Sequence, residues 1–485
     1  MDKQHIKLLS KTSRAHVEEG GHFEELLEVT STDCRTYHPI HCKQGLIDLG
    51  PAENALCDDL LLPVLNQNLP KISVEHIRYT NFSSSVGETG ITTLITKFLQ
   101  DEFSSNISES NLILTSGVGS ANEIISFAIA DKGDAFLVLA PYYYNFNDDA
   151  GLKPNVSLIP VYHDGTEKMS ECFNKALEKA RQDGINVRAV CIFNPNNPTG
   201  KVVGKDHILD LIDWCQENEL HLIVDEAYNL TVYEDKESFQ SVFSLVKPDN
   251  PYVHITWGLS KNFSVPGFRL GVLCSFNTAV LKLASRMAVY NSVPLYIRNI
   301  CSSLFIDRVQ CKKIIKESNE RLKKAKDYFT KRLADIGVAV CKDTISGFYV
   351  WADFSKYMPE KTIEAEKNIY KRLLKFGVCI TPGYMYSNLD YGFFRVIYAF
   401  PQPTIDLALE RIILALNPTE QPRILESLTS DIDDEIEFAV ETCTLEDDVK
   451  NLFSALRSDK QWVKENTGEK WAKENPAAAK IFEKK

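Results

Sequence analysis

The sequence predicts an α/β fold, with a large domain built on a mostly parallel sheet covered by helices and a smaller α+β domain after it. Two observations carry this prediction. From residue 111 onward, short and nearly continuous apolar runs alternate with amphipathic segments, which is typical of buried parallel strands joined by helices. The chain of 485 residues also exceeds what one hydrophobic core supports, so more than one domain is expected.

The apolar runs set the order of the expected elements. In the large domain we expect a helix at 92–103, strands at 112–114, 136–139, 156–161, 187–193, 220–224, 253–257 and 270–274, and interleaved helices at 171–181 and 207–218. After a helical stretch at 306–336, the smaller unit is expected to have strands at 347–354, 378–381 and 393–400 and helices at 363–376 and 404–416.

Changes in composition suggest five regions. We expect an N-terminal arm at 1–36, a segment at 37–80 that contributes to the small domain, the large domain at 81–305, the small domain at 306–417 and an acidic, helical extension at 418–485. The extension carries Trp462 and Trp471, so it is either a solvated helical appendage or a helix that docks on a partner.

Composition excludes several functional classes. A formal charge of −12 and a pI near 5.5 argue against nucleic-acid binding. No run of about twenty apolar residues predicts a membrane span, and the N-terminus shows no secretory signal, so a cytoplasmic location is expected. The twelve cysteines form no CxxC pair and many lie in apolar runs, which favours buried thiols over disulfides or a metal site.

The turn after the run 112–114 has the composition of an anion cradle. It contains Gly117, Val118 and Gly119 and leads into an amphipathic helix. The first turn of a helix leaves N–H groups unpaired at the positive end of its dipole, so a phosphate fits there. Asn122 stands in place of the third glycine of a dinucleotide fingerprint, which disfavours a nicotinamide dehydrogenase.

Chemically distinctive residues follow the ends of several expected strands, where ligands collect in parallel sheets. They are Tyr143, Asn197, Asp225 with Tyr228, and Lys261. Lys261 lies in a turn of small residues, and Arg269 follows eight positions later. A buried lysine amine has a lowered pKa and becomes a nucleophile towards aldehydes, while an arginine suits a phosphate.

Four motifs in order give the sequence a family resemblance. The runs 194–200 and 225–228, Ser260-Lys261 with Arg269, and Phe394-Arg395-Val396 resemble the signatures of class I aminotransferases, which are fold-type-I pyridoxal-phosphate enzymes. The runs 52–54, 120–123, 133–138, 141–143 and 265–269 are similar to the aminocyclopropane-carboxylate synthase branch. The likeness extends from about residue 37 to 416.

The resemblance implies roles around the cofactor ring. Lys261 is expected to bind the cofactor aldehyde as an aldimine and then to remove the substrate Cα proton. Asp225 is expected to keep the pyridine nitrogen protonated, which makes the ring an electron acceptor. Tyr228 and Asn197 would hydrogen-bond the phenolic oxygen of the ring, and Tyr143 would stack on its face. Catalysis is therefore assigned to Lys261, Asp225 and Tyr228.

The resemblance also implies how phosphate and substrate are held. Arg269, Ser260 and the backbone N–H groups of Val118 and Gly119 are expected to bind the phosphate. The fork-shaped guanidinium of Arg395 is expected to bind the substrate α-carboxylate. Glu53, retained from the synthase branch, is expected in the substrate site.

Two positions depart from the family pattern. Gly258 stands where a serine commonly helps to bind the phosphate, so one phosphate contact is lost or moved. Ser85 stands where the synthase branch places a tyrosine that reaches the neighbouring subunit, and Tyr79 and Phe82 are the alternative aromatic residues for this place. This substitution puts cyclopropane formation from S-adenosylmethionine in doubt.

The sequence therefore predicts a pyridoxal-phosphate enzyme that acts on an L-α-amino acid, similar to aminocyclopropane-carboxylate synthases and with aminotransferase-type chemistry. A homodimer is expected, and S-adenosylmethionine is one possible substrate. The alternatives left open are a C–S lyase and a non-catalytic homologue that works as a binding protein. Product analysis separates the enzymes, and absorbance with added cofactor separates both from a binding protein.

Overall fold

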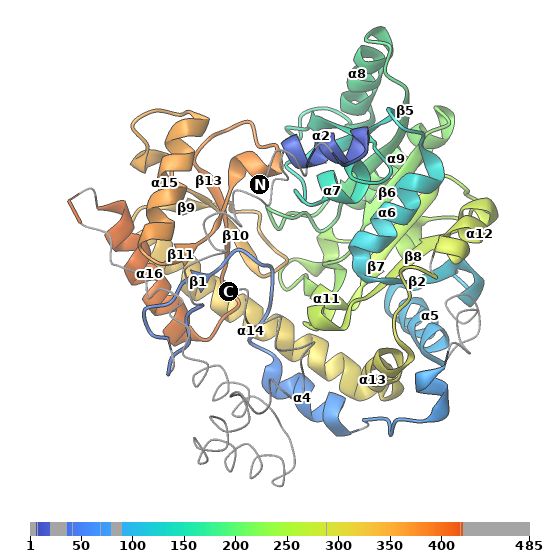
Figure 1. Ribbon diagram of the computed structural model, residues 1–485, viewed down its shortest axis with the longest axis horizontal. Coiled ribbons are helices and arrows are strands. Elements are labelled where there is room, and N and C mark those ends of the chain that lie inside the picture. Colours follow the sequence, from blue (N-terminus) through green and yellow to red (C-terminus); the bar gives the residue numbers. More distant parts are fainter. Residues whose placement is uncertain are drawn as a thin grey trace, which may run out of the picture.

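The computed structural model describes residues 6, 8–19, 36–40, 42–67, 69–78, 90–287, 289–417 and 419–420. They form two lobes, shown side by side in Figure 1. The larger lobe is built on a seven-stranded sheet of order β2-β8-β7-β6-β5-β3-β4. Its strands are β2 (Leu112–Ser116), β3 (Ala135–Ala140), β4 (Ser157–Tyr162), β5 (Val187–Phe193), β6 (His221–Asp225), β7 (Val253–Gly258) and β8 (Leu270–Ser275).

The strand directions confirm a mostly parallel sheet. The neighbours β4, β3, β5, β6 and β7 are parallel, whereas β8 runs antiparallel to both β7 and β2. All seven expected strands are present, each within two residues of its predicted ends. Five parallel strands therefore bring their carboxyl ends to one edge of the sheet, where ligand sites collect.

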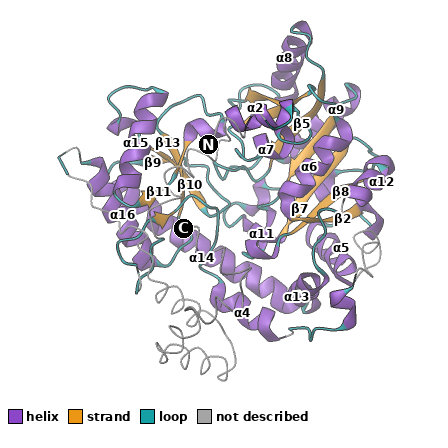
Figure 2. Ribbon diagram, in the orientation of Figure 1, coloured by secondary structure: helices purple, strands orange, loops and turns teal. Residues whose placement is uncertain are grey.

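Helices cover both faces of this sheet (Figure 2). Leu137 packs in the core on one face, while its neighbours Phe136 and Val138 pack on the other, as the two-residue period of a strand requires. One face is covered by α4 (Asp58–Gln67), α5 (Gly90–Phe103), α8 (Met169–Gln182), α9 (Lys205–Glu217) and α13 (Leu295–Ile306); the other by α6 (Gly117–Ile129), α7 (Phe146–Gly151) and α12 (Thr278–Met287). The described N-terminal region adds α2 (Lys11–Glu19), and α10 (Val242–Leu245) and α11 (Leu259–Asn262) are single turns.

The smaller lobe is the expected α+β unit. Its antiparallel sheet has the order β12-β13-β10-β9, formed by β9 (Ala339–Val340), β10 (Tyr349–Asp353), β12 (Thr381–Pro382) and β13 (Phe393–Ile397). The helices α15 (Ile363–Lys375) and α16 (Gln402–Leu416) pack against each other in its core, and the long α14 (Arg308–Asp335) contributes Leu322 and Phe329 to the same core.

One expected strand of this lobe divides into two. The predicted strand 378–381 is wrong as a single element, because Cys379 of β11 (Val378–Cys379) pairs with Asp48 whereas Thr381 of β12 pairs with Arg395. The chain leaves one sheet and enters another at Ile380, and an apolar run by itself does not reveal such a change of partner.

The segment at 37–80 is shared between the lobes. Its strand β1 (Ile47–Asp48) pairs in parallel with β11 of the small lobe. Leu61 and Leu65 of α4, by contrast, belong to the hydrophobic core of the large lobe. This segment therefore crosses the junction between the lobes, and the domain boundaries remain a prediction. The extension with Trp462 and Trp471 lies outside the described residues.

Two further expectations concern the chain as a whole. Across the ranges given above, no helix is long and apolar enough to cross a membrane. Ten of the twelve cysteines lie in those ranges, and nine of the ten are buried, which fits their positions in apolar runs.

Candidate active site

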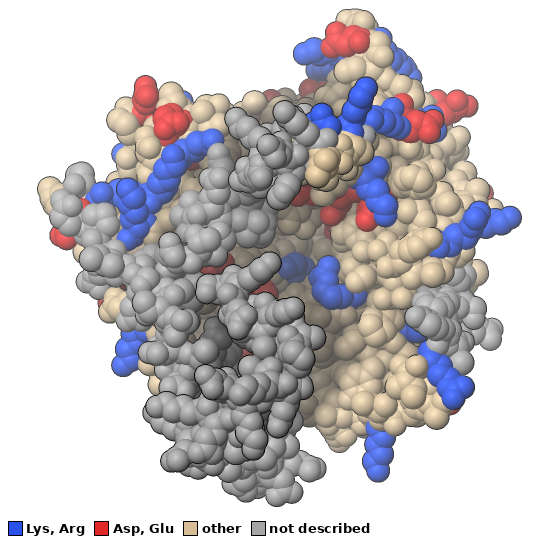
Figure 3. All heavy atoms as spheres, viewed as in Figure 1, with Lys and Arg blue, Asp and Glu red and all other residues tan. Residues whose placement is uncertain are grey.

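A cavity of about 360 Å³ lies at the carboxyl edge of the large sheet, between the two lobes. Figure 3 shows this face hollowed between the lobes, with Lys or Arg side chains visible in the hollow. The cavity brings together ten of the eleven residues predicted from the sequence: Val118, Gly119, Tyr143, Asn197, Asp225, Tyr228, Ser260, Lys261, Arg269 and Arg395. Its volume lies within the range of small-molecule sites.

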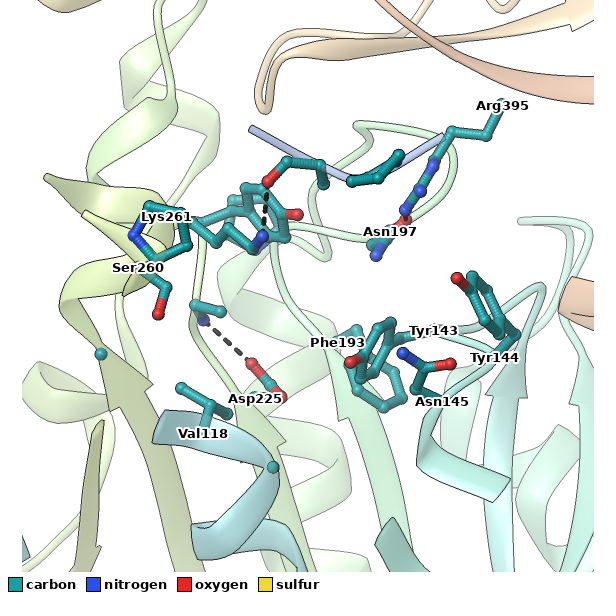
Figure 4. Close-up of a pocket in the computed structure, with 18 of the residues that line it drawn as sticks. Val118, Tyr143, Tyr144, Asn145, Phe193, Asn197, Asp225, Ser260, Lys261 and Arg395 are labelled. Atoms are coloured by element: carbon teal, nitrogen blue, oxygen red, sulfur yellow. Dashed lines mark hydrogen bonds between the residues drawn. The ribbon is translucent and has the colours of Figure 1, made fainter. Parts of the chain in front are cut away.

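Asp225 ends β6 at the floor of this cavity (Figure 4). Its side chain is 5% exposed, and burial raises the pKa of its carboxyl to about 6. Oδ1 accepts a hydrogen bond from the backbone N–H of Ala227 at 3.0 Å, and Oδ2 accepts one from Nδ2 of Asn122 at 3.4 Å. Both oxygens are thus oriented, with lone pairs left for a ligand.

Lys261 lies on the single turn α11, directly after β7. Burial and, after it, the positive charge of Arg395 lower the pKa of the amine to about 8. The amine donates a hydrogen bond to the backbone carbonyl of Ala52. A lysine with this pKa has a larger neutral fraction near pH 7 than an ordinary lysine, and only the neutral amine is a nucleophile or base.

Two tyrosines complete the middle of the cavity. Tyr228 is packed edge-on against the rings of Phe348 and Tyr349, and its buried hydroxyl has no hydrogen-bond partner among the described residues. A buried hydroxyl without a partner is costly, which indicates that a ligand supplies one. Tyr143 lies edge-on to Phe193, with 5.9 Å between the ring centroids, and both rings line the cavity.

Arg395 comes from β13 of the small lobe and is 2% exposed. Nη1 donates to Oδ1 of Asn197 at 3.0 Å, and Nη2 donates to the backbone carbonyl of Gly50. The guanidinium carbon lies 5.6 Å from the ring centroid of Tyr349 and 5.4 Å from that of Tyr386. The aromatic rings and the two acceptors hold a buried positive charge at the wall of the cavity.

The opposite end of the cavity is formed by the start of α6. Gly117, Val118 and Gly119 are the first three residues of this helix, and Gly117 has a φ of +80°. A Cβ at Gly117 would come within 2.4 Å of Nη2 of Arg269, so the guanidinium lies directly against this glycine. Free helix N–H groups, an arginine and the Ser260 side chain thus meet at one end, as anion binding requires.

The structure gives a steric reason for the glycine at position 258. A Cβ at this position would lie 2.9 Å from Cγ2 of Val118 and 3.1 Å from the carbonyl oxygen of Leu270. The Val118 side chain fills the space that a side chain at 258 needs.

Other residues of the site were missed or lie elsewhere. The cavity is also lined by Asp48, Tyr144 and Asn145, for which the sequence offered no motif. Glu53 is exposed and lies outside the lining, although its charge favours protonation of Lys261, so its role stays a prediction. Ser85, Tyr79 and Phe82 lie outside the described residues.

The residues present fit one cofactor. A buried carboxylate, a tyrosine hydroxyl without a partner, a lysine of lowered pKa and an anion cradle correspond to the ring nitrogen, phenolic oxygen, aldehyde and phosphate of pyridoxal phosphate. Fold and cavity together define a fold-type-I pyridoxal-phosphate-dependent enzyme.

Comparison with known proteins agrees with this class. Residues 46–412 match the family model of aminotransferase class I and II. The chain is 30% identical to a 1-aminocyclopropane-1-carboxylate synthase of Nicotiana tabacum over 78% of its length and 80% of that protein's length. It is also 30% identical to a probable aminotransferase of Arabidopsis thaliana, over 80% and 81% of the two lengths. The chain belongs to the aminotransferase class I and II family, as the motifs predicted.

The fold is also similar to solved structures. A double mutant of the aspartate aminotransferase of Thermus thermophilus superposes with a TM-score of 0.63, covering 86% of this chain and 99% of that one at 20% identity. At this identity the likeness shows the fold, and the chemistry rests on the family and the site.

Proposed function

We propose that this protein converts an L-α-amino acid by aminotransferase-type chemistry that begins with removal of the Cα proton by Lys261. Pyridoxal phosphate, when bound, supplies an aldehyde that condenses with amines and a ring that accepts electrons from Cα. The observation that carries the proposal is the lysine amine with a pKa of about 8 in the same cavity as the buried carboxylate of Asp225.

Four residues would hold the ring and its charge. Asp225, whose two oxygens are both oriented, would accept a hydrogen bond from the protonated ring nitrogen. The hydroxyl of Tyr228 and the Nδ2 of Asn197 would donate to the phenolic oxygen, since Oδ1 of Asn197 already accepts from Arg395. The ring of Tyr143 would cover one face and keep water away from it.

The phosphate and the substrate would bind at opposite ends of the cavity. Arg269, Ser260 and the N–H groups of Val118 and Gly119 would hold the phosphate. Arg395 would bind the substrate α-carboxylate, which directs the Cα proton towards Lys261. Lys261 would take up that proton and return it at another position, which requires a pKa near the working pH.

The test begins with cofactor binding. Purified protein mixed with pyridoxal phosphate is expected to gain visible absorbance that Lys261→Ala removes. Unchanged absorbance in the variant, or no absorbance in the wild type, would refute the proposal that the protein is a pyridoxal-phosphate enzyme. Incubation with L-amino acids, S-adenosylmethionine included, is expected to yield a keto acid and pyridoxamine phosphate. Aminocyclopropane carboxylate would instead indicate the chemistry for which the tobacco relative is named, and pyruvate with ammonia a C–S lyase.

A homodimer and a cytoplasmic location belong to the same proposal. Apolar side chains are exposed along α4 and the following segment, where Leu62, Ile72 and Ile77 are 55%, 74% and 73% exposed. Both α4 and the turn Val74–Ile77 contact α13. Exposed apolar side chains on such neighbouring elements fit a surface that a second copy of the chain covers. Ile72→Asp with Ile77→Asp is expected to give a monomer in light scattering, and an unchanged mass would refute this interface.

A further inference from the structure

Asn122 lies between two acidic side chains at the base of the cavity. Its Nδ2 donates to Oδ2 of Asp149 at 3.1 Å and to Oδ2 of Asp225 at 3.4 Å. Asn122 is fully buried on the first turns of α6, while Asp149 comes from α7. One amide therefore links the carboxylate at the end of β6 to a second carboxyl outside the cavity lining.

The orientation of this amide is fixed by its neighbours. Both acceptors lie at the nitrogen, and Oδ1 is buried without a partner among the described residues. Turning the amide over would point its oxygen at two carboxyl groups, which is unfavourable when either is ionised. Gly119 leaves room for Asp149, because a Cβ there would lie 3.0 Å from its Oδ1.

We infer that Asn122 and Asp149 are positioning residues for Asp225, and that the charge of Asp149 sets how strongly Asp225 holds the proton on the cofactor ring. Asp149 orients the amide, and the amide in turn orients the carboxylate. The inference rests on the proposed function for its link to the cofactor, but the contact with Asp225 exists in the protein alone.

The electrostatics of the pair support this arrangement. Burial, and to a smaller extent the charge of Asp225, raise the pKa of Asp149 to about 7, and burial raises the pKa of Asp225 to about 6. The other titratable groups near Asp149 are Asp148 on its own helix, Glu123 on α6, Tyr143 and the buried Cys191 of β5. Two buried carboxyls that share one donor are expected to influence each other's ionisation.

The first test uses the protein without cofactor. Urea unfolding is measured for Asn122→Leu, Asp225→Asn and the double variant. Asn122→Leu is expected to lower the midpoint when Asp225 is present, because its carboxylate loses a donor, and to lower it clearly less in the Asp225→Asn background. Equal losses in both backgrounds would overturn the inference, whatever the protein does with pyridoxal phosphate.

The second test uses the loaded enzyme and its spectrum. Asn122→Leu is expected to weaken cofactor binding about tenfold, as the loss of one hydrogen bond to a charged group does. Asp149→Asn keeps an acceptor for the amide but removes the charge, so the pH midpoint of the visible absorbance is expected to fall by about half a unit. Binding and midpoint unchanged in both variants would overturn the inference.

Ser126→Ala supplies the matched control. Ser126 is fully buried one turn further along α6, its hydroxyl has no partner among the described residues, and it does not line the cavity. Its replacement perturbs the same helix without contacting Asp225. The urea midpoint is therefore expected to change, whereas the pH midpoint of the visible absorbance is expected to stay the same. A midpoint shift in Ser126→Ala equal to that in Asp149→Asn would assign the effect to helix packing and overturn the inference.

Discussion

The two ends of the cavity are built differently. At the ring end, Asp225 is 5% exposed and each of its oxygens accepts a hydrogen bond. At the phosphate end, Arg269 is exposed, and its contacts with Pro266 and Ser116 carbonyls measure 3.3 and 3.5 Å. The carboxylate at the ring end is thus buried, whereas the arginine at the phosphate end is open to solvent. Substitution of Asp225 itself is expected to change mainly the reaction, and substitutions at the phosphate end to change only cofactor affinity.

The largest effect is expected from Asp225→Asn. The amide keeps the shape of the side chain but loses the charge that, in the proposed function, would hold the ring proton, so kcat/KM for an accepted amino acid is expected to fall about 10³-fold. Steady-state kinetics at saturating cofactor measure this loss. A change of less than tenfold with an unaltered circular dichroism spectrum would contradict the assignment of Asp225.

A smaller loss is expected from Arg395→Lys. Lysine keeps the charge but not the fork that binds a carboxylate and bonds Asn197, so kcat/KM is expected to fall about 100-fold, mainly through KM. Cofactor affinity, measured by fluorescence, serves as the control and should change little. If affinity falls while KM is unaltered, Arg395 belongs to the cofactor site instead.

Lys261→Met tests whether the ring end stores an unfavourable charge. The folded-state pKa of about 8 lies below the 10.5 of a lysine in water, so the ammonium form opposes folding below pH 8. Wild-type stability therefore rises as pH increases from about 8 to 10.5, and it is at its lowest below that window. Cofactor-free Lys261→Met is expected to be more stable by about 2 kcal/mol at pH 7. The gain should vanish above pH 10.5 in urea unfolding; a pH-independent difference would contradict it.

The smallest effect is expected at the phosphate end, from the pair Val118 and Gly258. Gly258→Ser alone is expected to weaken cofactor binding about tenfold, because its Cβ collides with the valine. Val118→Gly with Gly258→Ser removes the closest contact but leaves the carbonyl oxygen of Leu270 at 3.1 Å, so it is expected to restore part of the lost binding. Additive losses in the double variant, measured by equilibrium dialysis, would show that the two positions do not interact.

The sequence predicted most of the fold, and ten of the eleven site residues it predicted line the cavity. Apolar strands that end in Asp225 or shortly before Lys261 place these residues by local pattern alone. The contact of Asn122 with Asp149 and Asp225 was not predicted from the sequence. Asn122 lies 27 positions from Asp149 and 103 positions from Asp225, so the contact depends on how α6 and α7 pack. The break at Ile380 escaped for a similar reason, since strand partners are set by tertiary contacts.

The Arg395 guanidinium has more hydrogen-bond donors than its contacts within the protein use. Arginine has five N–H protons, and the contacts with Asn197 and Gly50 use two of them, which leaves three. Under the proposed function, a substrate carboxylate would bind donors of Arg395 that these two contacts do not use. The acid group of the substrate, Arg395 and Asn197 would then form one continuous chain of polar contacts that ends where the phenolic oxygen of the cofactor would lie. Substrate binding would thus change the surroundings of that oxygen before the reacting bond is engaged.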